Sequence, residues 1–596
     1  MESDLSVFLS FFIATAGVAV MTYFIVRKMD KSDNPTEEFF TGGRSLAWPV
    51  VAGSLLLTNI STEQLVGLNG AVFKDGNLVG IAWEALAAFA MIATALLFLP
   101  HYLASGFTTT TAFLEKRFDR SVRQIVSGLF LFGYVTVLLP TILYTGSLAL
   151  QTIFQFTFPL WISVLLIGGL GSAYAIFGGL KSVAVSDTLN GVGLLIGGLA
   201  IPILALKALG DSSIMDGLTT VFTEKADYLT PLATLDRRGE PTSVPWPTLL
   251  TGMMFIQVFY WSTNQVVVQR ALGARNLAEG QKGVLFASVM KLVGPLMLCA
   301  PGIIALHMLG DLSVQIDLDT LKNSVAGLSS GGAELSQSMQ EAMVYAQTLI
   351  GQHQASFSLS LADAERLNGI VSINDQVYPA MIREVITAGW ARGLFAAVLV
   401  GSILSSFNSA LNSASTLFCL EFYEEKVRTQ FDDPHALAGH VVKIGQRFGL
   451  TLAAISMIIA PFLADLDSIF EYLQKVNGLY SVPIISIFLV GILSQKAPAS
   501  GAKWAIVLGM ISYGYFSFFG TDFFHWLHGY AISFALAIAT LLFFAARQPR
   551  SAEEIAGEPL PPPPVDMTPW KHAKLASVVI VILTILIYAL LCIAAQ

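Results

Sequence analysis

The stretch Leu57-Thr-Asn-Ile-Ser-Thr-Glu-Gln64 lies within an apolar run, residues 48–71, that is long enough to cross a membrane. Most of its side chains are polar or β-branched, and both properties weaken a helix. Non-helical backbone is tolerated at membrane depth only where it is buried in protein or lines a water-filled cavity. A broken helix here therefore predicts a ligand site, and the ionisable Glu63 supports that interpretation. The alternative is a continuous helix whose polar face is bonded to a neighbouring helix.

A second polar stretch, Gln257-Val-Phe-Tyr-Trp-Ser-Thr-Asn-Gln265, interrupts the apolar run 246–269, five runs further along the chain. Two interrupted helices at corresponding places in two halves predict an inverted repeat with a binding site between the halves. Taken alone, Tyr260 and Trp261 also fit an aromatic belt at the membrane surface.

The composition is that of a membrane protein. Of the 596 residues, 54% are hydrophobic and 12% are charged, against about 25% charged in soluble domains. The net charge of −8 offers no basic surface, so nucleic-acid binding is not expected. Fourteen apolar runs are predicted to span the membrane: 6–27, 48–71, 79–104, 124–154, 157–177, 183–207, 246–269, 283–309, 388–420, 444–464, 469–495, 501–519, 524–546 and 574–594.

The basic residues predict the orientation. With the N-terminus outside, most of the 33 Lys and Arg residues fall in inner segments. The first run follows the acidic Glu2 and Asp4, unlike a signal peptide, and should stay as an anchor. We expect a multi-pass protein of the cell membrane, surrounded by lipid bilayer, with both termini outside and no obligatory protein partner.

Several polar residues lie inside the predicted spans. Lys291 sits in the eighth run, Glu84 in the third and Gln474 in the eleventh. Lys291 could instead extend to the inner surface. Together, an ammonium, a carboxylate and amides predict a cavity for a neutral polyhydroxylated ligand, because each hydroxyl both donates and accepts hydrogen bonds.

The ninth run carries small hydroxyl residues on one helical face, at positions 402, 405, 406 and 409. Such a face permits close helix packing. It also offers neutral oxygen ligands of the kind that suits Na⁺, whereas Mg²⁺ and Ca²⁺ normally require carboxylates. The residues leave both interpretations open.

The chain resembles the sodium/solute symporter family, most closely its bacterial sodium/galactose branch, from about residue 5 to residue 547. The marks of the resemblance are Gly42-Gly-Arg-Ser45, Asn59-Ile-Ser-Thr-Glu-Gln64, Gly178-Gly-Leu-Lys-Ser182, Asp187, Tyr260-Trp261, Asn264-Gln265, Gln269-Arg270, Gln281-Lys-Gly283 and the run from Ser405-Ser406 to Thr416.

The resemblance implies an all-α integral membrane protein with a LeuT-like core of five plus five helices in inverted repeat, flanked by extra helices. Mapped onto this sequence, the expected parts are an N-terminal extra helix and inner loop (1–47), the first repeat (48–207), an outer loop (208–245), the second repeat (246–495) with its long outer loop 310–387, and C-terminal extra helices (496–596) with a proline-rich inner linker (547–573).

The resemblance also implies the coupling ion and its ligands. Na⁺ would be held by the carbonyls of Leu57, Ile60 and Ser402 and by the hydroxyls of Ser405 and Ser406. A second Na⁺, or an exit path for the first, would involve Asp187 and Ser409, although Asn408 stands where a further hydroxyl ligand is expected.

For the substrate, the resemblance implies a sugar and a set of contacting residues. These are Gln64, Glu84, Lys291 and Gln474, with Asn59 and Ser61 close by and Tyr260 as an inner gate that stacks on the ring. Gln257 belongs to the same set, but it stands where the sodium/galactose branch has an asparagine. Glu63 and Asn264 resemble a pair that bridges the two broken helices.

The expected function is Na⁺-coupled import of a monosaccharide such as galactose or glucose by alternating access. The alternatives are a symporter of another polyol or acid, such as inositol or sialic acid, and a sugar-gated sensor or uniporter on the same scaffold. A carboxylated substrate is usually bound by an arginine, and the only arginine expected inside a span is Arg392, near an outer end. An enzyme is not expected, because no His-Glu-x-x-His motif occurs.

Overall fold

The computed structural model of the chain describes residues 2–29, 35–154, 158–316, 318–330, 337–354, 356–367, 370–371, 373–465, 469–520, 524–551 and 563–596. The helices of the first third are α1 (Glu2–Arg27), α2 (Pro35–Thr41), α3 (Trp48–Asn59), α4 (Thr62–Asp75), α5 (Ala82–Ala93), α6 (Leu99–Ala104), α7 (Thr110–Arg117), α8 (Arg120–Gly133), α9 (Leu139–Phe154) and α10 (Leu160–Leu209). The π-helical turns Thr94–Phe98 and Tyr134–Leu138 join α5 to α6 and α8 to α9.

The remaining helices are α11 (Ile214–Thr223), α12 (Gly252–Ser262), α13 (Gln265–Leu272), α14 (Leu277–Val293), α15 (Pro295–Leu298), α16 (Ala300–His307), α17 (Leu318–Ser330), α18 (Gln337–Gln352), α19 (Leu361–Ala364), α20 (Val377–Val385), α21 (Gly389–Phe418), α22 (Glu424–Val427), α23 (Pro434–Ile459), α24 (Ile469–Leu493), α25 (Ala499–Phe518), α26 (Trp526–Arg547) and α28 (Ala573–Ala594). In the described residues the only sheet pairs β1 (Ser313–Ile316) with β2 (Phe357–Ser360) in antiparallel register.

Helices occupy all fourteen predicted runs. Among the described residues, nine helices are long and apolar enough to cross a membrane, or ten if α14 and the bent segment Pro295–His307 form one span. The runs 48–71 and 246–269 each fold as two short helices, so they do not meet that length on their own. The count of fourteen crossings stays a prediction.

The chain between residues 160 and 209 has two helical parts, as the runs 157–177 and 183–207 predict. It folds as α10, broken only at Gly179, where φ is +60° and ψ is −177°. A side chain is strained at that φ. A Cβ there would also lie 3.1 Å from the carbonyl oxygen of Phe39. Glycine therefore provides both the bend and the close approach of α2.

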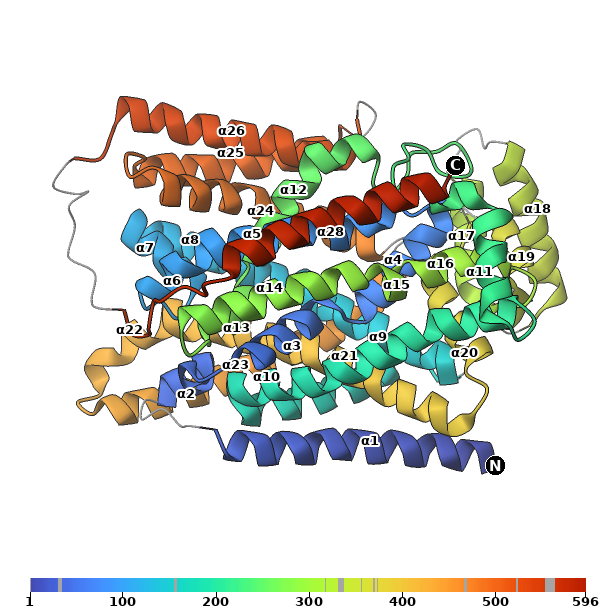
Figure 1. Cartoon of the computed structure of the whole chain (residues 1–596), viewed down its shortest axis with the longest axis horizontal. Helices are drawn as coiled ribbons and strands as arrows, with labels where there is room; N and C mark the ends of the chain where they lie inside the picture. The colour runs from blue at the N-terminus through green and yellow to red at the C-terminus, as the bar shows by residue number, and fades with distance from the viewer. Residues whose placement is uncertain are drawn as a thin grey trace.

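The helices run roughly along one direction, and both termini lie at the same end of the molecule, near α17 and α18 (Figure 1). The short helices α2 and α22 lie at the opposite end. α1 and α28 expose rows of large apolar side chains, including Leu9 and Phe12 on α1 and Leu590 and Ile593 on α28. Such faces suit lipid rather than water.

The two long loops that were expected outside carry structure of their own. The helix expected over 331–350 is α18, and residues 331–336 lie outside the described part. In the proline-rich linker, residues 552–562 are likewise not described. The segment that follows is docked: Leu277 N donates to the Asp566 carbonyl over 3.0 Å, and Trp570 N donates to Gln281 Oε1 over 2.8 Å.

Candidate functional site

The predicted break in the run 48–71 is present. α3 ends at Asn59, Ile60 and Ser61 are extended, and α4 starts at Thr62. The last carbonyls of a helix lack intrahelical donors and carry the negative end of its dipole. The end of α3 therefore presents carbonyl oxygens, including that of Leu57, inside the protein.

The second predicted break is also present. α12 ends at Ser262 and α13 begins at Gln265. Asn264 caps α13, because its Oδ1 accepts from Val266 N over 3.1 Å, and the same oxygen accepts from the Tyr134 hydroxyl over 2.7 Å. The prediction of two interrupted helices is confirmed.

The serine face of α21 lies against the end of α3. The Ser402 hydroxyl donates to the Ile60 carbonyl over 3.0 Å, and the Ser406 hydroxyl donates to the Leu57 carbonyl over 3.4 Å. Two carbonyls and two hydroxyls thus converge from two helices. They are neutral oxygens, the ligand set that fits a monovalent hard cation.

Ser405 and Ser402 differ in detail from the expected ligand set. The Ser405 hydroxyl donates to Asp187 Oδ1 over 2.6 Å, and Ser54 donates to Asp187 Oδ2 over 2.9 Å. Ser405 therefore faces the aspartate of α10 in this structure. Ser402 meets Ile60 through its hydroxyl, so a role for its carbonyl stays a prediction.

A buried charged cluster lies beside the end of α3. The Lys291 ammonium donates to Glu84 Oε1 over 2.5 Å and to Asn59 Oδ1, and it lies 5.5 Å from the ring centre of Trp261. Lys291 is 1% exposed and Glu84 is fully buried. Lys291 does not extend to the membrane surface, and its two partners come from α5 and α3.

Of the other expected substrate residues, Gln257 and Tyr260 contact neighbours of this cluster. Gln257 donates to the carbonyl of Trp83, next to Glu84, over 2.8 Å. Tyr260 is half-buried and packs edge-on against Trp261. No hydrogen bond in the described residues joins Gln64 or Gln474 to Lys291 or Glu84; the buried Gln64 Oε1 has no partner, and the Gln474 carbonyl accepts from Tyr530.

The expected bridge between Glu63 and Asn264 is not formed in this structure. Ser61 donates to Glu63, which closes a local contact across the break, and Asn264 is held by Tyr134. Glu63 and Asn264 each bond to a group beside their own break, so neither side chain is turned toward the other.

Arg270 is the residue that the sequence analysis missed. It is fully buried on α13, one residue beyond the predicted run 246–269, where a membrane-flanking residue would be exposed. Its Nε donates to Thr58 Oγ1 over 3.1 Å and its Nη1 to the Val266 carbonyl over 2.7 Å. Arg270 thereby ties α13 to the end of α3. In the sequence, a buried arginine near the end of an apolar run cannot be told from an exposed arginine that flanks the membrane. Only the packing of the helices distinguishes these two cases.

The comparisons with known proteins agree with this architecture. The sequence profile of the "Sodium:solute symporter family" matches residues 39–327 and 335–509. The chain belongs to the sodium:solute symporter family. It is 36% identical to the Escherichia coli (strain K12) protein named "Uncharacterized symporter YidK", over 98% of this chain and 90% of that protein.

Two further relatives have solutes in their names. The chain is 28% identical to the "Sodium/glucose cotransporter" of Vibrio parahaemolyticus, over 85% of this chain and 83% of that one. It is 27% identical to the "Sodium/myo-inositol cotransporter 2" of Oryctolagus cuniculus, over 81% of this chain and 65% of that one.

Among solved structures, a Na⁺-coupled sialic acid symporter superposes with a TM-score of 0.68 at 18% identity, covering 91% of this chain and 98% of that one. This likeness concerns the fold, and it confirms the all-α, LeuT-like architecture. The protein is a sodium-solute symporter of the membrane, and Na⁺ is its coupling ion. Its family is one of transporters, not enzymes.

Proposed function

We propose that this symporter imports a neutral monosaccharide, such as galactose or glucose, into the cell by alternating access. The observation that carries the proposal is the buried cluster of Lys291, Glu84 and Asn59 at the α3 break. Its ammonium donates, its carboxylate accepts and its amide does both, so the cluster can bind adjacent sugar hydroxyls.

The charge of the cluster favours a neutral ligand. Lys291 and Glu84 form an ion pair without net charge, so the cluster holds no uncompensated cation to bind a carboxylated substrate. Gln64, Gln257 and Gln474 would complete the site as neutral donors and acceptors, with Ser61 and Tyr260 at its edge. Glu63 and Asn264 would support the two breaks from behind.

Na⁺ would bind where the end of α3 meets α21. We assign it to the Leu57 and Ile60 carbonyls and to Ser402, Ser405 and Ser406, with Asp187 and Ser409 as a second position or an exit path. One cation there would hold α3 against α21, which favours the arrangement in which Asn59 meets the sugar. Each charge moved across the membrane contributes about 2.3 kcal/mol per 100 mV.

The remaining assignments follow the same scheme. The repeats would be residues 48–207 and 246–495, with the other segments as loops and extra helices. The protein would lie in the cell membrane with both termini outside, and the basic residues near α2 and α22 on the inner side. The common position of the termini in Figure 1 supports an even number of crossings.

The deciding experiment is uptake into proteoliposomes of labelled galactose, glucose, myo-inositol and sialic acid, with an inward Na⁺ gradient or with K⁺ in place of Na⁺. We expect Na⁺-dependent accumulation of one neutral sugar. Accumulation of myo-inositol or sialic acid would support the alternative of another polyol or acid, which the name of one relative favours. Equilibration that ignores Na⁺ would support a uniporter or sensor.

A matched pair of variants distinguishes a loss of sugar binding from a general loss of stability. Gln474→Ala is expected to weaken sugar binding, whereas Ser486→Ala on the same helix removes only a hydroxyl bonded to the Val482 carbonyl one turn away. Unchanged sugar affinity in Gln474→Ala would remove this residue from the site.

A further inference from the structure

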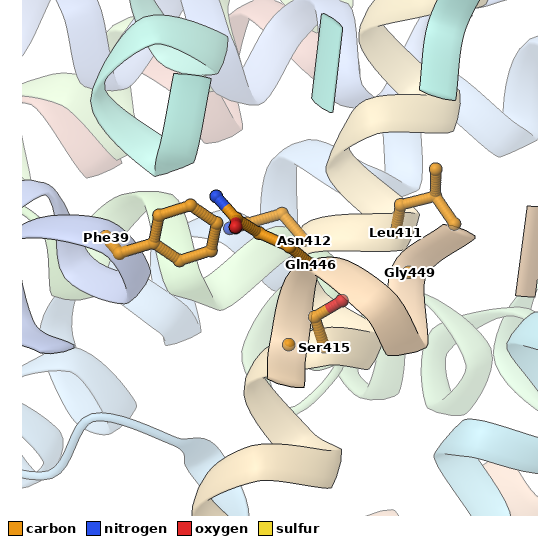
Figure 2. A pocket seen from close by; sticks show the side chains of 7 residues that line it. Phe39, Leu411, Asn412, Ser415, Gln446 and Gly449 are labelled. Atoms are coloured by element: carbon orange, nitrogen blue, oxygen red, sulfur yellow. The ribbon is translucent and has the colours of Figure 1, made fainter. Parts of the chain in front are cut away.

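A small cavity lies between α2, α21 and α23, away from the substrate cluster. It is lined by Phe39, Leu411, Asn412, Ser415, Gly445, Gln446 and Gly449, and its free volume of about 10 Å³ is room for about one water molecule. Figure 2 shows the side chains of Asn412 and Gln446 reaching toward the ring of Phe39. The cavity lies toward the end of the molecule that carries α2, opposite the termini.

The cavity contains an amide without a protein partner. Asn412 is 4% exposed, and neither its Oδ1 nor its Nδ2 makes a hydrogen bond in this structure. Leaving one buried polar group unpaired costs about 1–3 kcal/mol. Helix packing alone does not account for an amide here, since an apolar side chain of the same shape would avoid that cost. A polar occupant of the cavity would satisfy it.

The unpaired oxygens continue from Asn412 back toward the proposed ion site. Ser409 Oγ and Asn408 Oδ1 are also buried without partners, and Ser409 lies one turn before Asn412 on α21. Residues three and four apart lie on the same helical face. From Ser406 to Asn412 the rise along the helix is about 9 Å. The side-chain oxygens of Ser406, Ser409 and Asn412 are therefore spaced about one helical turn apart along α21.

Two glycines of α23 keep the cavity open. A Cβ on Gly449 would lie 3.1 Å from Ser415 Oγ, and a Cβ on Gly445 would lie 3.1 Å from Cys419 Sγ. Both contacts are too tight for an ordinary Cβ, so a side chain at either position would narrow the space between α21 and α23.

We propose that this cavity is an inner station at which Na⁺, partly hydrated, pauses on its way from the ion site to the inner solution. Asn412 Oδ1 would replace part of the hydration shell, Ser409 Oγ would be the step before it on α21, and water at the open mouth would supply further ligands. Phe39 limits access at the mouth. The inference rests on the proposed function, since it needs Na⁺ to be released on the α2 side.

The test compares two transport modes of the same proteoliposomes. Net uptake of labelled galactose under a Na⁺ gradient requires Na⁺ to leave inside in every cycle. Counterflow of galactose at equal, high Na⁺ on both sides does not, because the sugar can exchange while Na⁺ stays bound. We expect Asn412→Leu to lower net uptake about tenfold, equivalent to about 1.4 kcal/mol, and to leave counterflow and equilibrium binding of radioactive Na⁺ near wild type.

Two further variants keep the result interpretable. Asn412→Ser retains an oxygen and should restore net uptake, while Gly449→Ala should slow it by narrowing the cavity. Ser413→Ala is the matched control, because its hydroxyl bonds Gln269 Oε1 on another face of the helix, and the ratio of net uptake to counterflow should not change.

If Asn412→Leu lowers net uptake and counterflow equally, Asn412 serves packing and the inner station is overturned. If it lowers neither, Asn412 has no role in transport and the inner station is likewise overturned. Wild-type protein that takes up galactose without any response to the Na⁺ gradient would instead overturn the proposed function, and the inner station with it. The two failures are therefore distinguished in the same experiment.

Discussion

Lys291 and Glu84 show how single residues shape the site. Both are buried, and each charge is tolerated because the other lies 2.5 Å away. Removing one partner of such a pair leaves an uncompensated charge, whereas replacing both with apolar residues is often neutral for stability. The pair is therefore explained better by substrate recognition than by a need for stability.

A variant series tests this explanation. Glu84→Gln should destabilise the protein by about 3–5 kcal/mol, because it leaves the Lys291 ammonium unpaired. The double variant with Glu84→Leu and Lys291→Met should recover most of that loss and still fail to bind sugar. Melting in detergent and calorimetric titration with galactose measure the two effects. A double variant that binds galactose normally would remove the pair from the site.

Ser406 makes the corresponding test for the ion. Ser406→Ala removes a hydroxyl that faces the Leu57 carbonyl, so half-maximal uptake should require about fivefold more Na⁺, equivalent to about 1 kcal/mol. The Na⁺ dependence of uptake is the measurement. Ser486→Ala serves as the control, and an unaltered Na⁺ requirement in Ser406→Ala would contradict the assignment of Ser406 as a ligand.

At the scale of helices, the sequence predicts where two membrane helices are interrupted, but it does not predict which hydrogen-bond partners the serines of α21 have. The polar runs inside apolar ones predict the breaks after Asn59 and before Gln265. A membrane helix tolerates such an interruption only where it lines a binding site or a cavity. Helical spacing places Ser402, Ser405 and Ser406 on one face. It cannot tell that Ser405 turns to Asp187, since that depends on how α10 packs beside α21.

Gly179 sets the bend of α10 through a backbone conformation that a side chain would strain. Gly179→Ala places a Cβ at φ +60° and ψ −177°, near the Phe39 carbonyl, and should destabilise the protein by about 1–3 kcal/mol. Gly169→Ala on the same helix is the control, because its Cβ would meet nothing within 4 Å. The melting temperatures of the two variants in detergent should differ. Equal melting temperatures would mean that α10 can straighten without cost.

At the scale of the whole molecule, the two proposed sites share one helix end. Because α3 offers carbonyls to α21 and Asn59 to Lys291, occupancy of one site should change the affinity of the other. Thermodynamic linkage requires that the two effects be equal. The arrangement thus links ion and sugar through one short segment of backbone.

Equilibrium binding measures this linkage. The dissociation constant of galactose should be lower in Na⁺ than in K⁺ by about 5- to 150-fold, and galactose should lower that of Na⁺ by the same factor. Titration calorimetry of the purified protein in both orders provides the two ratios. Unequal ratios would show that a third ligand takes part, and ratios of one would show that the sites are independent.

The Lys291–Glu84 pair has a consequence for how the chain is made. Its partners are separated by 207 positions in the sequence, so the ribosome releases Glu84 long before Lys291. A lysine at the centre of a helix opposes insertion by the translocon by about 2.5–3.5 kcal/mol. We therefore expect Glu84, which is synthesised first, to lower the cost of placing the Lys291 ammonium in the membrane.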